Sequence, residues 1–149
     1  MSSVFRILIP AYNVAPYIAK TIQSVLDQTV SHYQCYILDD ASTDQTANIA
    51  EGITDPYPQF SILRRPYRHY SLQNFYNFLL NASFNDEDIV MVLDGDDWLS
   101  PKALETLQRV YQAEDPLMTY GNFLTYPMGD ISWASPLPEF VVSAGLYRL

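Results

Sequence analysis

Short apolar runs alternate along the chain with longer segments in which apolar residues recur every three or four positions. The runs are typical of buried β-strands, and the periodic segments are typical of helices with one apolar face. The predicted strands are Val4–Ile9, Tyr33–Leu38, Phe60–Leu63, Ile89–Leu93 and Leu117–Tyr120, and the predicted helices cover about 16–28, 42–51, 71–80 and 100–114. This alternation predicts an α/β fold, with a mostly parallel sheet and helices on both of its faces.

Residue types at the ends of these segments predict where several elements begin or stop. Pro10 is expected to end the first strand, because a proline cannot donate a hydrogen bond to the ladder. Ser42-Thr-Asp-Gln45 has the form of a capping box, and Ser71 is expected to cap the third helix. The apolar residues expected to face inward from that helix are Leu72, Phe75, Tyr76, Leu79 and Leu80.

Composition narrows the class of protein. The chain has 149 residues and a net charge of −9, from 8 Lys and Arg against 17 Asp and Glu. This length fits a single domain over 1–149, and the charge argues against nucleic acid or an anionic membrane as the main partner. Cys35 lies in an apolar run and is expected to be a buried thiol. The sequence contains no signal peptide and no apolar run long enough to span a membrane, so a cytoplasmic protein is expected.

Polar residues follow three of the predicted strands directly. Tyr12 comes after the first strand, Asp39 and Asp40 after the second, and Asp94-Gly-Asp96 after the fourth. In parallel sheets ligands bind outside the carboxyl ends of the strands, so these groups are expected to converge on one edge.

Asp94-Gly-Asp96 places two carboxylates around a glycine, which lets backbone and ligand approach closely without a Cβ atom. Such hard oxygen ligands suit Mg²⁺ or Mn²⁺, which take one or two protein carboxylates and fill their other positions with water and phosphate. The structural alternative is that Asp96 and Asp97 lead only into the following helix, where acids are common.

Three other chemistries of acidic strand ends fit the spacing poorly. A calcium loop would need an acid and a glycine where the chain has Trp98 and Leu99. A phosphatase of the haloacid dehalogenase type would have a small β-branched residue in place of Trp98. A phospho-receiver domain carries its acidic pair after the first strand, whereas Asp39-Asp40 follows the second. A phosphatase or receiver domain that uses Asp94 or Asp40 as a phosphate acceptor is therefore kept only as a weaker alternative to the two functions given below.

Three blocks of the sequence together resemble glycosyltransferase family 2. They are Phe5-Arg-Ile-Leu-Ile-Pro-Ala-Tyr-Asn13, Ile37-Leu-Asp-Asp-Ala-Ser-Thr-Asp-Gln-Thr46 and Val90-Met-Val-Leu-Asp-Gly-Asp-Asp-Trp-Leu-Ser-Pro101. They occur in the family's order and at similar spacing, and the resemblance covers residues 4–120. It implies a GT-A-type fold and a divalent cation, Mn²⁺ or Mg²⁺. It also implies transfer of a sugar from a nucleoside diphosphate, here a UDP-linked donor, to an acceptor hydroxyl, with inversion.

The resemblance assigns roles to four positions. Tyr12, flanked by Pro10 and Ala11, matches the tyrosine that packs on the base, and Asp40 matches the carboxylate that accepts from the ring N–H of uracil. Asp94 matches the acid near ribose and metal, and Asp96 the metal ligand. The full set of expected site residues is Pro10, Ala11, Tyr12, Asp40, Asp94, Gly95 and Asp96. Asp39 and Asp44 are expected to be turn and cap residues, and Asp97 to support the loop.

A basic cluster precedes the third helix. Arg64, Arg65 and Arg68 could contact the diphosphate, and a solvated basic patch is an equally good interpretation. His69 and His32 are excluded from the expected site. Members of the family often have a glycine followed by Ala-Arg-Asn in this helix, where this chain has Leu72-Gln-Asn-Phe-Tyr-Asn77, so no diphosphate contact is assigned to the helix.

No general base can be assigned. Inverting members use a carboxylate from further along the chain, and only Asp130 and Glu139 follow Tyr120, neither with a supporting motif. Residues from about 121 to 149 are expected to be an irregular tail that begins the acceptor side. Two functions follow as hypotheses: a metal-dependent glycosyltransferase domain, and a noncatalytic nucleotide-sugar-binding module or fragment that lacks the base. The acceptor and the oligomeric state are left open.

Overall fold

A computed structural model describes residues 4–121 and 123–130 of the chain. Its elements are β1 (Phe5–Ala11), α1 (Ile18–Leu26), β2 (Tyr33–Asp39), α2 (Thr46–Thr54), β3 (Phe60–Arg64), α3 (Ser71–Asn81), β4 (Ile89–Val92) and α4 (Ala103–Glu114). The chain forms two compact units, residues 1–105 and 106–149, and the sheet lies entirely in the first. The α/β fold expected from the sequence is confirmed.

All four strands are parallel, in the order β3-β2-β1-β4. From β1 the chain moves outward through β2 to β3 and then returns to the other side of β1 to form β4. The strand order therefore reverses at β1. In open parallel sheets this reversal opens a crevice at the carboxyl ends of the strands, where ligands bind.

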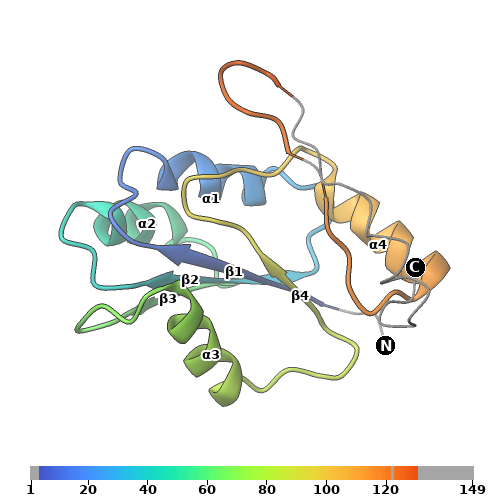
Figure 1. The fold of residues 1–149 in the computed structure, drawn as a ribbon, viewed down its shortest axis with the longest axis horizontal. Coiled ribbons are helices and arrows are strands. Elements are labelled where there is room, and N and C mark those ends of the chain that lie inside the picture. Colours follow the sequence, from blue (N-terminus) through green and yellow to red (C-terminus); the bar gives the residue numbers. More distant parts are fainter. Residues whose placement is uncertain (1–3, 122, 131–149) are drawn as a thin grey trace, which may run out of the picture. The chain divides into compact units, whose positions relative to one another are not determined.

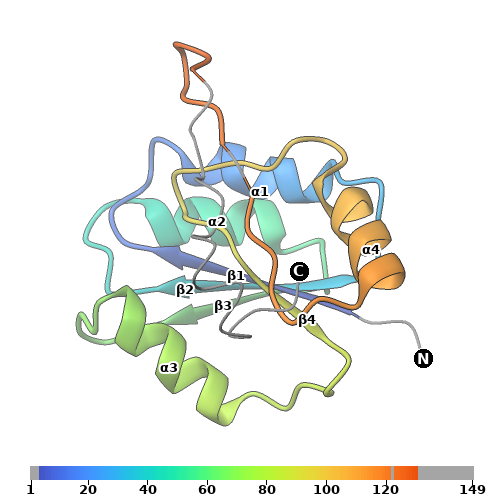
Figure 2. The same ribbon diagram turned by 45° about the vertical axis from the view of Figure 1, so that its right-hand side comes forward.

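Helices cover both faces of the sheet. Figures 1 and 2 show α1 and α2 on one face and α3 on the other. Leu8 and Leu38 are fully buried against Phe78 of α3. Because successive side chains of a strand point to opposite faces, the equally buried Ile7 and Ile37 face α1 and α2. Cys35 is a buried free thiol, as expected, and burial raises its pKa.

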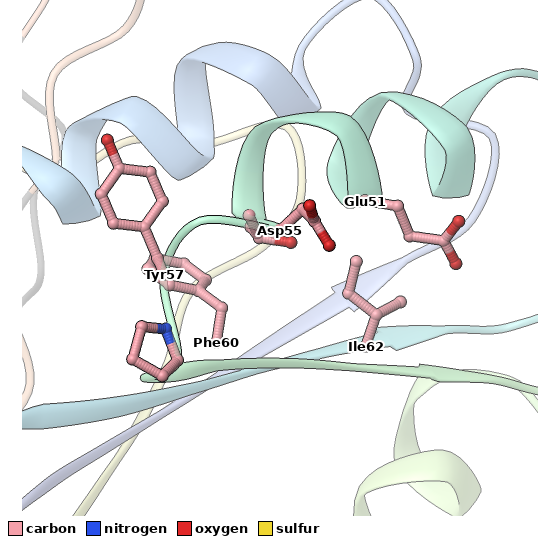
Figure 3. Close-up of a pocket in the computed structure, with 7 residues that line it drawn as sticks. Glu51, Asp55, Tyr57, Phe60 and Ile62 are labelled. Atoms are coloured by element: carbon pink, nitrogen blue, oxygen red, sulfur yellow. The ribbon is translucent and has the colours of Figure 1, made fainter.

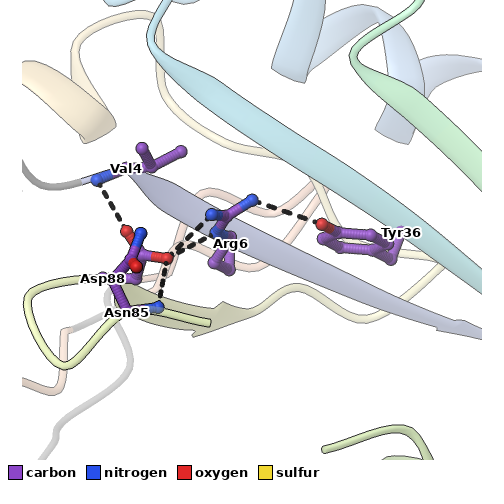
Figure 4. Close-up of polar contacts among 5 residues, drawn as sticks. All are labelled: Val4, Arg6, Tyr36, Asn85 and Asp88. Atoms are coloured by element: carbon purple, nitrogen blue, oxygen red, sulfur yellow. Dashed lines mark hydrogen bonds and ion pairs between the residues drawn. The ribbon is translucent and has the colours of Figure 1, made fainter. Parts of the chain in front are cut away.

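A polar cluster ties the start of β1 to the loop before β4 (Figure 4). Nε of Arg6 donates to Oδ2 of Asp88 at 2.8 Å, and the Arg6 guanidinium lies 3.3 Å from the hydroxyl of Tyr36. The backbone N–H groups of Val4 and Asn85 also donate to Asp88. Burial on its own would raise the pKa of Asp88. These hydrogen bonds and the Arg6 charge outweigh it and hold the pKa below its ordinary value.

β1 runs through Pro10 to Ala11, so the expected end at the proline is wrong. The carbonyl of Pro10 accepts from the N–H of Gly95, which places the proline nitrogen on the β4 side of the strand. Pairing with β4 ends at Leu8 and Val92. The missing donor of Pro10 therefore costs the ladder no hydrogen bond.

The start of α2 also differs from the expectation. Ser42 and Gln45 form no capping box, and α2 has no side-chain cap on Gln45. Asp44 instead accepts from the backbone N–H of Thr46 at 2.9 Å and from its hydroxyl at 2.6 Å. The Ser42 hydroxyl accepts from the N–H of Asn13, 29 residues away. The tertiary contact between two loops has replaced the local one, and Asp44 is the cap residue that the sequence predicted.

α3 buries a different face from the expected one. Its buried residues are Asn74 and Phe78, whereas Leu72 is 83% exposed. Tyr76, Leu79 and Leu80 are exposed as well, and of the expected inward set only Phe75 packs against the core. The helix contains no charged residue. Its apolar positions lie on more than one side, so periodicity could not select the buried face.

The second unit contains most of α4 and the segment that follows it. The strand expected over Leu117–Tyr120 does not form, and Leu117 is largely exposed. Within the described residues this segment has no neighbouring strand, and an isolated strand is not stable in water. Turns and a single bridge follow up to Asp130. Residues 131–149, including Glu139, lie outside the described part, so the irregular tail and the single-domain assignment stay predictions.

Candidate functional site

A cavity of about 380 Å³ opens at the carboxyl ends of β1, β2 and β4 and at the first turn of α3. All seven residues expected at the site line it, from three strand ends that are far apart in the sequence. The complete lining is Pro10, Ala11, Tyr12, Val14, Asp40, Arg68, Tyr70, Ser71, Asn74, Asp94, Gly95 and Asp96. The cavity lies where the strand order reverses, as expected for a parallel sheet.

Tyr12 begins a loop that is held against the loop after β2. Oδ1 of Asn13 accepts from the backbone N–H of Thr43 at 2.8 Å, and the backbone N–H of Val14 donates to Oγ1 of Thr46 at 2.8 Å. Asn13 has a φ of 54°, a left-handed conformation that asparagine tolerates better than most residues. Hydrogen bonds in both directions between the two loops therefore fix the backbone on which Tyr12 is mounted.

Asp40 fixes the loop that precedes α3. Its carboxylate is 4% exposed, and its two oxygens accept from the backbone N–H groups of His69 and Tyr70, each at 2.7 Å. Asp40, which follows β2 directly, thus fixes the two residues that lead into α3. A carboxylate oxygen has two lone pairs, so these bonds leave acceptor capacity toward the cavity.

Tyr70 has a strained backbone, with φ 64° and ψ 154°. This region is populated almost only by glycine, and a side chain there costs on the order of 1–3 kcal/mol. The two hydrogen bonds to Asp40 hold the residue in place. The Tyr70 ring is 65% exposed, so packing in the core does not explain the strain.

Arg68 lies over two tyrosine rings of the cavity. Its guanidinium carbon is 3.8 Å from the ring centre of Tyr12 and 4.6 Å from that of Tyr70. Both distances are within the range of cation–π contacts. The Tyr12 ring, which the resemblance assigns to the base, is thus in contact with the Arg68 side chain.

The acidic loop after β4 is packed against β1. The hydroxyl of Thr21 donates to the carbonyl of Gly95 at 2.9 Å, and a Cβ atom on Gly95 would lie 2.9 Å from the carbonyl oxygen of Pro10. The glycine is therefore required by the backbone of β1. Burial raises the pKa of Asp97, and the charges of Asp96 and Asp94 raise it further.

The residues of this loop fit a divalent cation. Burial is the main cause of the raised pKa of Asp97, and the charges of Asp96 and Asp94 add to it. A bound cation would compensate these neighbouring charges, and carboxylate oxygens are the ligands that Mg²⁺ and Mn²⁺ prefer. Among the described residues, no three acidic, histidine or cysteine side chains converge into a preformed cage. A cation that takes one or two protein ligands, and water or phosphate for the others, needs no such cage.

The arginines of the basic cluster have separate surroundings. Arg64 pairs with Glu51 at 2.7 Å on α2, away from the cavity. Nε of Arg65 donates to Oδ1 of Asn74 at 2.9 Å, and the amide of Asn74 lies 3.4 Å from the carbonyl of Leu38. Only Arg68 of the three lines the cavity.

Asp39 is buried beside this site but does not line the cavity. Its Oδ1 atom has no hydrogen-bond partner among the described residues. The backbone carbonyl of Asp39 does make a hydrogen bond, since it accepts from the N–H of Arg65 at 2.9 Å. The Oδ1 atom therefore makes no cap or turn contact within the described part of the chain.

Five lining residues are absent from the sequence-based site: Val14, Arg68, Tyr70, Ser71 and Asn74. Arg68 was assigned a possible diphosphate contact only as one of three equivalent arginines. Val14 lies in the loop after β1, just past the first of the three sequence blocks. Tyr70, Ser71 and Asn74 lie at the start of α3, where the chain departs from the family pattern, so no motif identified them. The one available signal was the position of Ser71, Tyr70 and Asn74 around the start of a helix after the third strand.

A second cavity, of about 290 Å³, lies between α2 and β3 (Figure 3). It is lined by Glu51, Thr54, Asp55, Tyr57, Pro58, Phe60 and Ile62. It contains none of the expected site residues and no basic side chain. Since its charged lining residues are both acidic, it has no group that would bind a phosphate, and we place the candidate site at the strand ends.

Comparisons with known proteins identify the family of this chain. The model of the family described as Glycosyl transferase family 2 matches residues 6–145. The chain is 23% identical over 130 residues to the glycosyltransferase GlyG of Streptococcus pneumoniae, an alignment that covers 87% of this chain and 42% of GlyG.

Two solved structures share the fold. TarS 1-349 of S. aureus in complex with UDP-GlcNAc has a TM-score of 0.65 and 21% identity, over 78% of this chain and 32% of that one. The mannosyltransferase PcManGT of Pyrobaculum calidifontis, in complex with GDP-Man and Mn2+, has a TM-score of 0.63 and 21% identity, over 75% and 32%. These likenesses show a GT-A-type α/β fold.

The chain spans about two fifths of GlyG and about a third of the two solved chains. No helix in the described ranges is both long and apolar enough to cross a membrane. The cytoplasmic location stays a prediction. The family match extends over most of the chain and includes every residue of the cavity. The chain therefore belongs to glycosyltransferase family 2.

Proposed function

We propose that this chain is the nucleotide-sugar-binding part of a metal-dependent glycosyltransferase that transfers a sugar from a UDP-linked donor to an acceptor hydroxyl. The observation that carries the proposal is the convergence of Tyr12, Asp40, Asp94 and Asp96 on one cavity at the carboxyl ends of three strands. Family membership supports sugar transfer, and the relatives solved with UDP-GlcNAc and with GDP-Man and Mn2+ support a nucleotide-sugar donor and a divalent cation.

Four of the lining residues have roles that follow from their chemistry. The ring of Tyr12 offers a face for the base, and Asp40 offers a carboxylate oxygen to a ring N–H of uracil. Asp96 would hold Mn²⁺ or Mg²⁺, with Asp94 beside it. When bound, such an ion neutralises the negative charge that develops on the leaving diphosphate. In a chain with a net charge of −9, this neutralisation also lets an anionic ligand approach the acidic loop.

A noncatalytic binding module is the second candidate function. It is favoured because each of the three carboxylates that line the cavity, Asp40, Asp94 and Asp96, already has another role. Asp40 already accepts two backbone hydrogen bonds, and the other two are assigned to ribose and metal. None of them is left to deprotonate an acceptor hydroxyl. Glu139 lies outside the described residues, and Asp130 is exposed in the second unit.

Both candidate functions require metal-dependent binding of UDP. Calorimetric titration of UDP, with and without Mn²⁺, tests this requirement. We expect binding that weakens at least tenfold when the metal is removed, and the same loss in Asp96→Asn with metal present. Asp86→Asn is the matched control, because Asp86 is an exposed acid outside the cavity. UDP binding that is indifferent to metal, or absent, would overturn the proposal.

Sugar release separates the enzyme from the binding module. We expect the chain to hydrolyse or transfer the sugar of a UDP-linked donor in the presence of Mn²⁺, and Asp96→Ala to abolish this turnover. Metal-dependent UDP binding without turnover of any UDP-sugar would favour the module. Tighter binding of GDP than of UDP would contradict the assignment of the base.

A further inference from the structure

Tyr70 and Arg68 have no role in the function proposed above, yet both line the cavity. The guanidinium of Arg68 lies over the ring of Tyr12 and over the ring of Tyr70, at 3.8 Å and 4.6 Å from the two centres. A guanidinium is a flat group that stacks on aromatic rings, as a pyrimidine base does. The Arg68 guanidinium, which contacts both rings, therefore occupies the position that a base stacked on them would take and has similar stacking properties.

The backbone of Tyr70 indicates that the position of its ring has a use. Tyr70 has a φ of 64° and a ψ of 154°, a conformation almost restricted to glycine, and its ring is largely exposed. A glycine at this position would relieve the strain, and the exposed ring returns little packing in compensation. Asp40 holds the strained residue through the N–H groups of His69 and Tyr70. Strain of this kind collects at ligand clamps.

We propose that Tyr12 and Tyr70 form a two-sided aromatic clamp for the nucleobase, and that Arg68 occupies the clamp until the base displaces it. This inference rests on the proposed function and adds to it a second aromatic contact and a side chain that competes with the ligand. Stacking of a base on an aromatic ring is stronger than an exposed cation–π contact, so the exchange favours the base. Asp40, which fixes Tyr70, also presents its carboxylate to the edge of the same base.

Binding of UDP to variants of Tyr70 tests the clamp. We expect Tyr70→Ala to weaken UDP binding roughly tenfold, as the loss of one stacking contact does, and Tyr70→Phe to keep the affinity because it keeps the ring. Tyr70→Gly removes the ring and also relieves the backbone. It should show the same loss of affinity with a thermal midpoint no lower than that of the unaltered chain. Tyr76→Ala is the matched control, since Tyr76 is 61% exposed on α3 and does not line the cavity.

Binding of pyrophosphate with Mn²⁺ gives a reference without a base. We expect its affinity to be the same in Tyr70→Gly as in the unaltered chain. UDP affinity that does not change in Tyr70→Gly would overturn the clamp and leave the proposed function standing. Failure of the unaltered chain to bind UDP would overturn both. A loss of pyrophosphate binding equal to the loss of UDP binding would also overturn the clamp, because it would place the effect on the phosphate side.

Uridine isolates the part played by Arg68, because it has no phosphate for an arginine to attract. We expect Arg68→Ala to bind uridine roughly threefold more tightly than the unaltered chain, since the base no longer displaces a cation from the two rings. The quenching of tyrosine fluorescence by bound uridine provides the readout. Weaker uridine binding in Arg68→Ala would show that Arg68 holds the base, and would overturn its role as a competitor.

Discussion

The backbone of Gly95 passes so close to β1 that an added Cβ atom would lie 2.9 Å from the carbonyl oxygen of Pro10 and 3.1 Å from Cγ2 of Val14. The sequence indicated that a glycine between Asp94 and Asp96 would let a ligand approach. The structure gives this glycine a further reason, the packing of the acidic loop on β1. The geometry of the loop is therefore set by the protein before any ligand binds.

Gly95→Ala should destabilise the fold by about 1–3 kcal/mol, because the backbone must shift to accommodate the methyl group. Gly52→Ala in α2 is the matched control. A Cβ atom there meets nothing within 4 Å, so alanine should stabilise the helix by about 0.5–1 kcal/mol. Urea denaturation of the two variants measures both changes. Equal stability of Gly95→Ala and the unaltered chain would contradict the packing argument.

The sequence identified site residues well where they follow a strand in one of the three blocks. Tyr12, Asp40 and Asp94 were placed at one edge because parallel strands end at the same edge. Tyr70 and Asn74 were missed, since their positions depend on a loop whose conformation is set by Asp40 from another strand. No local pattern in residues 64–74 contains that information.

At the scale of elements, the Arg6 and Asp88 cluster joins the first strand to the last strand of the sheet. The Asp88 side chain is 2% exposed, and its carboxylate accepts from Arg6, Val4 and Asn85. β4 pairs with β1 over only four residues, Phe5 to Leu8. Because this pairing is short, the hydrogen bonds of the cluster contribute much of the free energy that keeps β4 in the sheet.

Asp88→Asn should lower the free energy of unfolding by about 2 kcal/mol at pH 7, because an amide cannot replace the charged acceptor of Arg6. The pKa of Asp88 is lowered in the folded chain. Its contribution is therefore fully present above the unfolded pKa of about 3.9 and is lost as the pH falls through the folded pKa. Denaturation of both chains at several pH values tests this, and the difference should shrink below about pH 4.

Asp86→Asn is the control for this experiment, because Asp86 lies in the same loop and is exposed. It should unfold like the unaltered chain at every pH. A stability difference between Asp88→Asn and the unaltered chain that persists unchanged at pH 2 would show that the ionised carboxylate is not the source of the effect.

α3 shows that hydrophobic periodicity can predict a helix without predicting which of its faces is buried. Its existence was predicted, but Ser71, which was expected to cap it, is its first residue and makes no cap, because Tyr70 holds the N-cap position. Its buried face was not predicted either. A helix without charged residues offers apolar positions on several sides. The buried side was selected by the hydrogen bond between Asn74 and Arg65 and by the packing of Phe78 on Leu8 and Leu38, which are contacts with other elements.

At the scale of the whole molecule, the chain consists of two units, and the candidate site lies in the first, residues 1–105. All four strands, α1, α2 and α3 belong to this unit. Its core contacts join β1 to both neighbours and to the helices on either face. Everything that forms the cavity is thus encoded before the end of α4.

A chain that ends at Glu114 should therefore keep a cooperative urea transition and the UDP affinity of the full chain. It retains the whole first unit and all of α4. A chain that ends at Ala82 is the control. It lacks β4 and Asp88, so it should lose the cooperative transition. Circular dichroism and calorimetry provide the measurements, and a non-cooperative transition in the chain ending at Glu114 would show that residues 115–149 are needed for folding.

The sequence by itself determined the alternation of the first four strands with the four helices along the chain, the parallel sheet and the three groups of residues at its carboxyl edge. These follow from hydrophobic periodicity and from short motifs, which are local properties of the chain. Only the tertiary structure decided that β1 continues past Pro10, that Ser42 bonds to Asn13, that α3 buries Asn74, and that Arg68 lies against Tyr12 and Tyr70. Each of these depends on a partner from a distant segment, and hydrogen bonds and packing between such segments exist only after the chain has folded.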